Sequence, residues 1–131
     1  MPPVVTALYG ALNALFNIFL ANEVSRMRRK HDVGLGTGDD PAMLVAIRAH
    51  GNNAEFVPLA ILMLLLAELC GGASWALHAL GGALFAARIA HWIGIPRKAP
   101  NPFRFGGTAI TWTMIATCAG YVLYLRTTIG R

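Results

Sequence analysis

Three polar residues interrupt an apolar stretch of the sequence at a spacing typical of one side of a helix. Arg48, Asn52 and Glu55 lie four and then three residues apart, which places them in a single stripe at 3.6 residues per turn. A charged side chain at the centre of a membrane helix costs roughly 2.5–3.5 kcal/mol on insertion scales, so this polar stripe must face protein or water. Because guanidinium groups bind carboxylates through paired hydrogen bonds, the stripe favours a small anionic ligand.

A further charge, Arg88, lies inside a later apolar segment. Arg48 and Glu55 are two helical turns apart, about 10 Å along the axis, so we expect each to pair with another helix, first of all through a Glu55–Arg88 ion pair. Two interpretations stay open. One is a buried network that only fixes helix register. The other is a basic pocket that opens to the cytosol and binds a small polyanion or, in competition, the head groups of anionic lipids; further basic residues near it are Arg28, Arg29, Arg97, Lys98 and Arg104.

The elements that position these residues are predicted to lie in a membrane. Of the 131 residues 56% are hydrophobic and only 13% charged, whereas a water-soluble domain has about 25% charged residues. The apolar residues form long runs, which disfavour the alternating strands of a membrane barrel and favour spanning helices of about 20 residues. We therefore predict an all-α integral membrane protein, a single domain over residues 1–131 with four transmembrane helices at about 4–27, 42–69, 74–95 and 106–126.

The net charge of +5 does not indicate a nucleic-acid partner, because the basic residues gather at the ends of the predicted spans and form no basic face. Seven of them flank the loops near residues 30–41 and 96–105, against Arg126 and Arg131 at the other end. The positive-inside rule then places both loops in the cytoplasm and both termini outside. Cys70 and Cys118 are expected at different depths, so we predict no disulfide, and we expect no metal site.

Two segments resemble a known family. The string Arg48-Ala-His-Gly-Asn52-Asn-Ala-Glu55-Phe56-Val-Pro58 is similar to the second-helix signature of the MAPEG family, the membrane-associated proteins in eicosanoid and glutathione metabolism. Leu84-Phe85-Ala86-Ala87-Arg88 with His91 and Gly94 resembles the end of the family's third helix. The resemblance implies a bacterial-type member in the inner membrane: a homotrimer of four-helix subunits that binds glutathione as co-substrate between neighbouring subunits near the cytoplasmic face.

The resemblance also implies roles for individual residues. Arg48, Asn52 and Glu55 match the glutathione-binding signature, Arg88 a binding arginine, and Arg28 or Arg29 the basic end of the first helix. Arg104 matches the position that activates the thiol, and a cation there suits the chemistry, because the thiolate is the nucleophile and a free thiol with a pKa of about 8.5 is mostly protonated at neutral pH. The implied activity is a transferase or peroxidase acting on lipophilic electrophiles that arrive through the lipid.

Three departures from the family pattern keep other functions open. Phe56, His91 and Ile95 stand where better-characterised members carry tyrosine; His91 is a candidate replacement donor in the binding site, or an interfacial residue. A non-catalytic homologue that binds glutathione or lipid is therefore one alternative. A small multi-span transporter is the other, and it is disfavoured because arginines near Glu55 would keep that carboxylate ionised.

Overall fold

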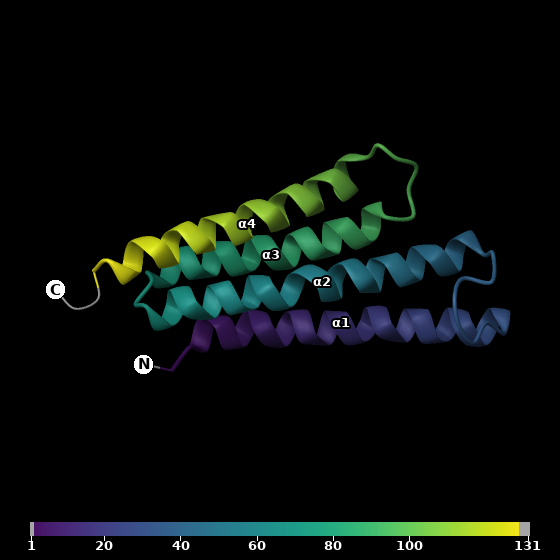
Figure 1. Ribbon diagram of the computed structural model, residues 1–131, viewed down its shortest axis with the longest axis horizontal. Coiled ribbons are helices and arrows are strands. Elements are labelled where there is room, and N and C mark those ends of the chain that lie inside the picture. The colour runs from purple at the N-terminus through teal and green to yellow at the C-terminus, as the bar shows by residue number, and fades with distance from the viewer. Residues whose placement is uncertain (1, 129–131) are drawn as a thin grey trace.

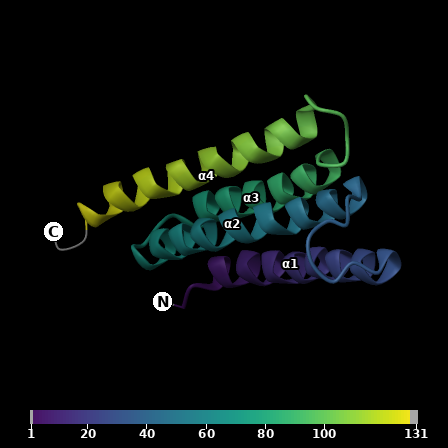
Figure 2. The same cartoon turned by 45° about the vertical axis from the view of Figure 1, so that its right-hand side comes forward.

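Four antiparallel helices make up the protein (Figure 1). The computed structural model describes residues 2–128, and in this part of the chain the elements are α1 (Val4–His31), α2 (Pro41–Leu69), α3 (Ser74–Gly94) and α4 (Pro102–Arg126), with no strand. Both long loops lie at one end of the bundle, and the α2–α3 turn and the two chain ends lie at the other (Figures 1 and 2). The predicted all-α architecture is confirmed.

The helix ends at the loops are set by local capping. The Asp40 carboxylate accepts a hydrogen bond from the Ala42 backbone N–H (2.8 Å) ahead of α2, and the Asn101 side chain accepts one from the Arg104 N–H (2.9 Å) ahead of α4. Each cap is followed by a proline, which suits the first helical position because it has no N–H to leave unpaired. The Asn101 cap starts α4 at residue 102, earlier than the predicted 106.

Three of the helices, α1, α2 and α4, are each long and apolar enough to cross a membrane. The chain is therefore an integral membrane protein. At 21 residues, α3 is about 30 Å long and falls outside this group, so its crossing stays a prediction. It lies against α4 at close range: a Cβ added to Gly107 would come within 2.7 Å of the Ala87 carbonyl oxygen and of the His91 backbone nitrogen.

Glu68, near the end of α2, ties the first two helices together. Its carboxylate oxygens accept hydrogen bonds from the backbone N–H groups of Val5 (2.9 Å) and Thr6 (2.6 Å), in the first turn of α1. These N–H groups have no partner within their own helix, so the carboxylate from α2 supplies their missing acceptors. Its negative charge also interacts favourably with the positive end of the α1 dipole. The sequence suggests only a solvated carboxylate at a membrane edge.

We expect Glu68→Ala to lower the free energy of unfolding by about 1–2 kcal/mol, the usual range for losing a helix cap. The matched control is Glu23→Ala, which removes a partly exposed α1 carboxylate that caps no helix and is paired with Arg26 one turn later (2.7 Å); such a pair contributes only about 0.3–0.5 kcal/mol. Thermal unfolding in detergent measures both. Equal effects of the two substitutions would contradict a capping role for Glu68.

Candidate functional site

Arg88 lies at the centre of the bundle, with only 2% of its surface exposed. Its guanidinium donates three hydrogen bonds to neutral side chains: Nε to Asn53 Oδ1 (3.1 Å), Nη2 to Asn52 Oδ1 (2.6 Å) and Nη1 to Thr111 Oγ1 (3.3 Å). The planar fork of an arginine side chain suits this arrangement because it presents several N–H donors in fixed directions. Arg88 thereby holds α2, α3 and α4 together.

The network around Arg88 extends to the remaining helix. Asn53 donates through Nδ2 to Asn17 Oδ1 on α1 (3.0 Å), and the Thr111 hydroxyl donates to the Gly107 carbonyl (2.7 Å). We call Asn17, Asn52, Asn53, Arg88 and Thr111 the Arg88 network. It contains at least one side chain from every helix. The arrangement supports a structural role in fixing helix register, one of the two interpretations of the sequence.

The predicted Glu55–Arg88 ion pair is wrong. Glu55 instead lies 3.9 Å from Arg48 Nη1 on its own helix, and more than half of each of these two side chains is exposed (57% for Arg48, 54% for Glu55). The reason is geometric: Arg48 and Glu55 share the outward side of α2, while Asn53 turns inward, and the long arginine side chain spans the two turns that separate it from Glu55.

Within residues 2–128 no carboxylate forms an ion pair with Arg88. A buried cation without a counter-charge is unfavourable even when it is well hydrogen-bonded, because neutral acceptors replace only part of its hydration. Asn52 connects this cation to the outward side of α2, since it accepts from Arg88 and is itself partly exposed. An anion bound beside Asn52 would therefore be stabilised by Arg88.

The other predicted site residues lie in different surroundings. Arg104 is exposed on the first turn of α4, where it lines a groove of about 440 Å³ together with Thr108 and Trp112. Within the described chain no hydrogen bond or ion pair joins its side chain to the polar stripe. Phe56 of α2 lies near this groove, with its ring 6.2 Å from that of Trp112. The lining of the groove is thus mainly apolar and contains one cation.

Arg28, Arg29 and His91 are placed less favourably for binding within one chain. Arg28 donates to carbonyl oxygens of the α1–α2 loop, the shortest contact being 3.0 Å to Gly34, and so stabilises that loop. Arg29 is exposed at the same end. His91 is only 4% exposed and lies at the close approach of α3 and α4. The burial of His91 fits an interfacial residue better than a ligand donor.

Three members of the Arg88 network, Asn17, Asn53 and Thr111, are not among the site residues predicted from the sequence. Asn53 adjoins Asn52 in the polar half of α2, so its polarity was a usable signal. Asn13 and Asn17 share one side of their helix and are both expected to bond across helices; Asn17 does so with Asn53, whereas the Asn13 amide donates to the Tyr9 carbonyl of its own helix (2.8 Å). Threonine is common in membrane helices, where it often bonds to its own backbone, so Thr111 carries no comparable signal.

A bundle of apolar helices around a buried arginine, with a charged stripe on the outside of one helix, defines an integral membrane protein with a polar site within its membrane-embedded part. The MAPEG family model matches residues 6–124. The chain is also 35% identical over 108 residues, 82% of both chains, to the inner membrane protein YecN of Escherichia coli strain K12, and equally similar to YecN of strain CFT073. The chain belongs to the MAPEG family.

Proposed function

We propose that this protein is a glutathione-dependent transferase or peroxidase that acts on lipophilic electrophiles. The observation that carries the proposal is the polar stripe: Arg48 and Glu55 are exposed on the outside of a membrane helix, and between them Asn52 contacts a buried cation. Glutathione offers the matching groups. Its carboxylates suit Arg48 and the field of Arg88, its ammonium group suits Glu55, and its amides suit Asn52.

The exposed stripe also supports the proposed homotrimer. Charged groups that face lipid in mid-helix are unfavourable, so we expect a neighbouring copy to cover Arg48 and Glu55 and to complete the ligand site. Glutathione would then lie between subunits at the end of the bundle that bears the loops. We propose that this end faces the cytoplasm and, because the similar YecN is described as an inner membrane protein, that the membrane is the bacterial inner membrane.

In this proposal Arg104 activates the thiol. A guanidinium beside the sulfur stabilises the thiolate, and the thiol proton passes to water. The thiolate then attacks the electrophilic atom of an apolar substrate that enters from the lipid, with expulsion of its leaving group. With a hydroperoxide the thiolate attacks the terminal oxygen, the O–O bond breaks and the alcohol leaves after protonation; the sulfenic acid of glutathione then reacts with a second glutathione to give the disulfide and water. The groove along α4 that contains Arg104 is mainly apolar, which suits such a substrate.

We expect Arg104→Ala to abolish the ultraviolet thiolate signal that glutathione produces on binding, while glutathione binding itself weakens less than tenfold. Turnover with a chloronitroaromatic electrophile should fall by about 10²–10³-fold, the usual effect of losing one electrostatic contact to a developing charge. Arg97→Ala removes an exposed cation of the adjoining α3–α4 loop; it is the matched control and should change neither. Failure of the wild-type protein to bind glutathione by equilibrium dialysis would refute the proposed function.

A second candidate is a non-catalytic homologue that binds glutathione or lipid. The burial of His91 favours it, because this side chain replaces a family tyrosine yet does not reach the surface, and Phe56 supplies no hydroxyl donor at the other position. The ultraviolet thiolate signal and equilibrium dialysis together separate the two candidates. Glutathione binding with no thiolate signal in the wild-type protein identifies the non-catalytic homologue.

A further inference from the structure

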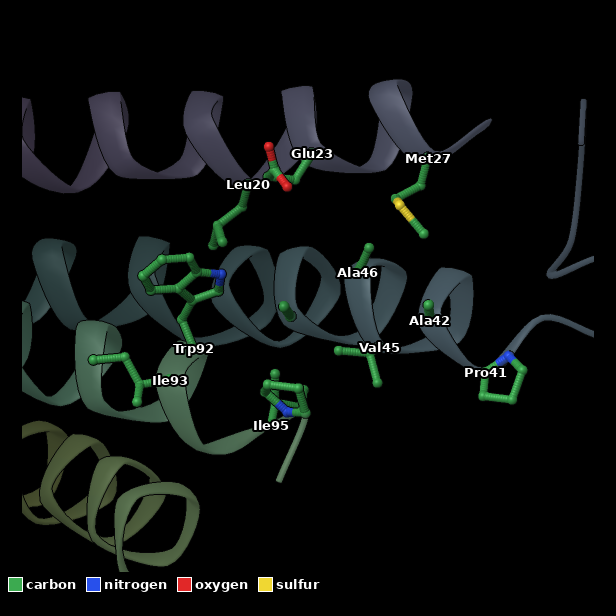
Figure 3. A pocket seen from close by; sticks show the side chains of 12 residues that line it. Leu20, Glu23, Met27, Pro41, Ala42, Val45, Ala46, Trp92, Ile93 and Ile95 are labelled. Carbon is green, nitrogen blue, oxygen red and sulfur yellow. The ribbon is translucent and has the colours of Figure 1, made fainter. Parts of the chain in front are cut away.

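A pocket of about 500 Å³ lies between α1, α2 and α3, close to the end of the bundle that bears the loops (Figure 3). It shares no residue with the Arg88 network or with the groove at Arg104. Its volume is within the range of small-molecule sites. Its walls are mainly apolar, and the larger side chains are Leu20, Met27, Val45, Trp92, Ile93 and Ile95. An occupant must therefore be apolar over most of its length.

One acidic side chain, Glu23, contributes to the wall. Both of its oxygens accept hydrogen bonds from Arg26, at 3.2 Å from Nε and 2.7 Å from Nη2. The pair is neutral overall, so Glu23 does not exclude an anion from the mouth of the pocket. Leu20 and Trp92 lie at the end of the pocket away from the loops, while Met27 and Pro41 lie toward the loops (Figure 3).

Basic residues adjoin the pocket along the chain on the side that faces the loops. Beyond Met27, α1 continues into Arg28, Arg29 and Lys30, and beyond Pro96 the chain continues into Arg97 and Lys98. Arg28 bonds to the loop carbonyls, the guanidinium of Arg97 lies 4.5 Å from the centre of the Phe103 ring, and all of these residues except Arg28 are exposed. The lining of the pocket is thus apolar, and the basic residues that adjoin it outnumber the acidic ones of the same end, Asp32, Asp39 and Asp40. The complementary ligand is an amphipathic molecule with an anionic head group.

We propose that this pocket binds one acyl chain of an anionic phospholipid, with the phosphate of the head group held by the exposed basic residues at the rim. The membrane supplies this ligand at high local concentration, since two walls of the pocket belong to helices able to cross the bilayer. Basic pockets between membrane helices are established sites for anionic head groups in general. The proposal does not depend on glutathione chemistry.

Trp92, in the wall of the pocket, provides a direct readout. The chain has three tryptophans, so the Trp75→Phe/Trp112→Phe variant leaves Trp92 as the sole fluorophore. In neutral detergent, phosphatidylglycerol with brominated acyl chains should quench it in a saturable manner. The half-saturating concentration should be about tenfold lower than for brominated phosphatidylcholine, because surface cations each strengthen binding of anionic lipids severalfold.

Two sets of variants in this background test the pocket and its rim separately. Ala46→Phe fills the pocket and should abolish saturable quenching by both lipids; Ala42→Phe does the same from an exposed position and serves if Ala46→Phe does not fold. Ala79→Phe, on a groove at the opposite end, is the size-matched control. Arg97→Gln/Lys98→Gln should abolish the preference for phosphatidylglycerol, whereas Arg126→Gln should leave it intact.

Three results would overturn the proposal. Equal quenching by the two lipids would show that the rim does not select anions. Quenching that survives in Ala46→Phe and Ala42→Phe would place the lipid elsewhere on the surface. A change of oligomeric state in these two variants, measured by light scattering while quenching is retained, would show that a second copy of the chain covers the pocket instead.

Discussion

Arg88→Ala is expected to lower the free energy of unfolding by about 3–5 kcal/mol, because three hydrogen-bond acceptors lose their donor and a large side chain is removed from the core. The substitution leaves Asn52, Asn53 and Thr111 without their donor and opens a cavity where the side chain was only 2% exposed. Each unsatisfied buried polar group is unfavourable by about 1–3 kcal/mol. Reversible unfolding in mixed micelles measures the loss.

Arg126→Ala, at the exposed end of α4, is the matched control and should change stability by less than about 0.5 kcal/mol. If Arg88→Ala does not fold, Thr111→Val keeps the test available, because it removes one acceptor and changes little volume; its expected cost is about 1 kcal/mol. Stability unchanged in either variant would show that the Arg88 network does not hold the helices together.

Arg48→Ala should weaken glutathione binding by about 10–100-fold, because a charge-assisted hydrogen bond contributes about 1.5–3 kcal/mol. Arg48 is exposed in a single chain and its contact with Glu55 is long, at 3.9 Å, so its loss should affect unfolding by less than about 1 kcal/mol. Equilibrium dialysis with labelled glutathione gives the affinity, and thermal unfolding gives the stability. A large loss of affinity without a loss of stability is specific to a ligand contact.

Lys98→Ala removes an exposed cation from the same end of the bundle, and it should weaken glutathione binding by less than about threefold. Light scattering on Arg48→Ala reports whether the polar stripe also joins subunits. If Arg48→Ala lowers stability and leaves glutathione affinity unchanged, the stripe only fixes helix packing, and the proposed binding site is wrong.

The sequence predicts the helices well, because the energy of placing a residue in lipid dominates their location. Spacing also identifies the side of α2 that bears Arg48, Asn52 and Glu55 correctly. It does not identify partners across helices. A period of 3.6 residues shows which side chains share one side of a helix, but it does not show how the neighbouring helix is rotated about its own axis. The predicted Glu55–Arg88 pair failed for this reason.

Helix ends are predicted less well, for a related reason. Hydropathy marks where a chain becomes apolar, while a helix begins at its cap. The α4 helix starts beside Asn101, whose side chain accepts from the Arg104 N–H, and α1 runs on through polar residues to His31. The Glu68 cap on α1 is beyond prediction from the sequence, because it depends on how the antiparallel packing of α1 and α2 brings the end of α2 beside the start of α1.

The hydrogen bonds from Arg88 to both α2 and α4 have a consequence for synthesis. The last contributor, Thr111, lies in the final helix, so a nascent chain that has inserted only its earlier helices holds a cation whose set of acceptors is incomplete. In such an intermediate Arg88 lacks one of its hydrogen-bond acceptors within the lipid. Chaperones and proteases act on incompletely folded chains of this kind, so the insertion of α4 would protect the chain from them.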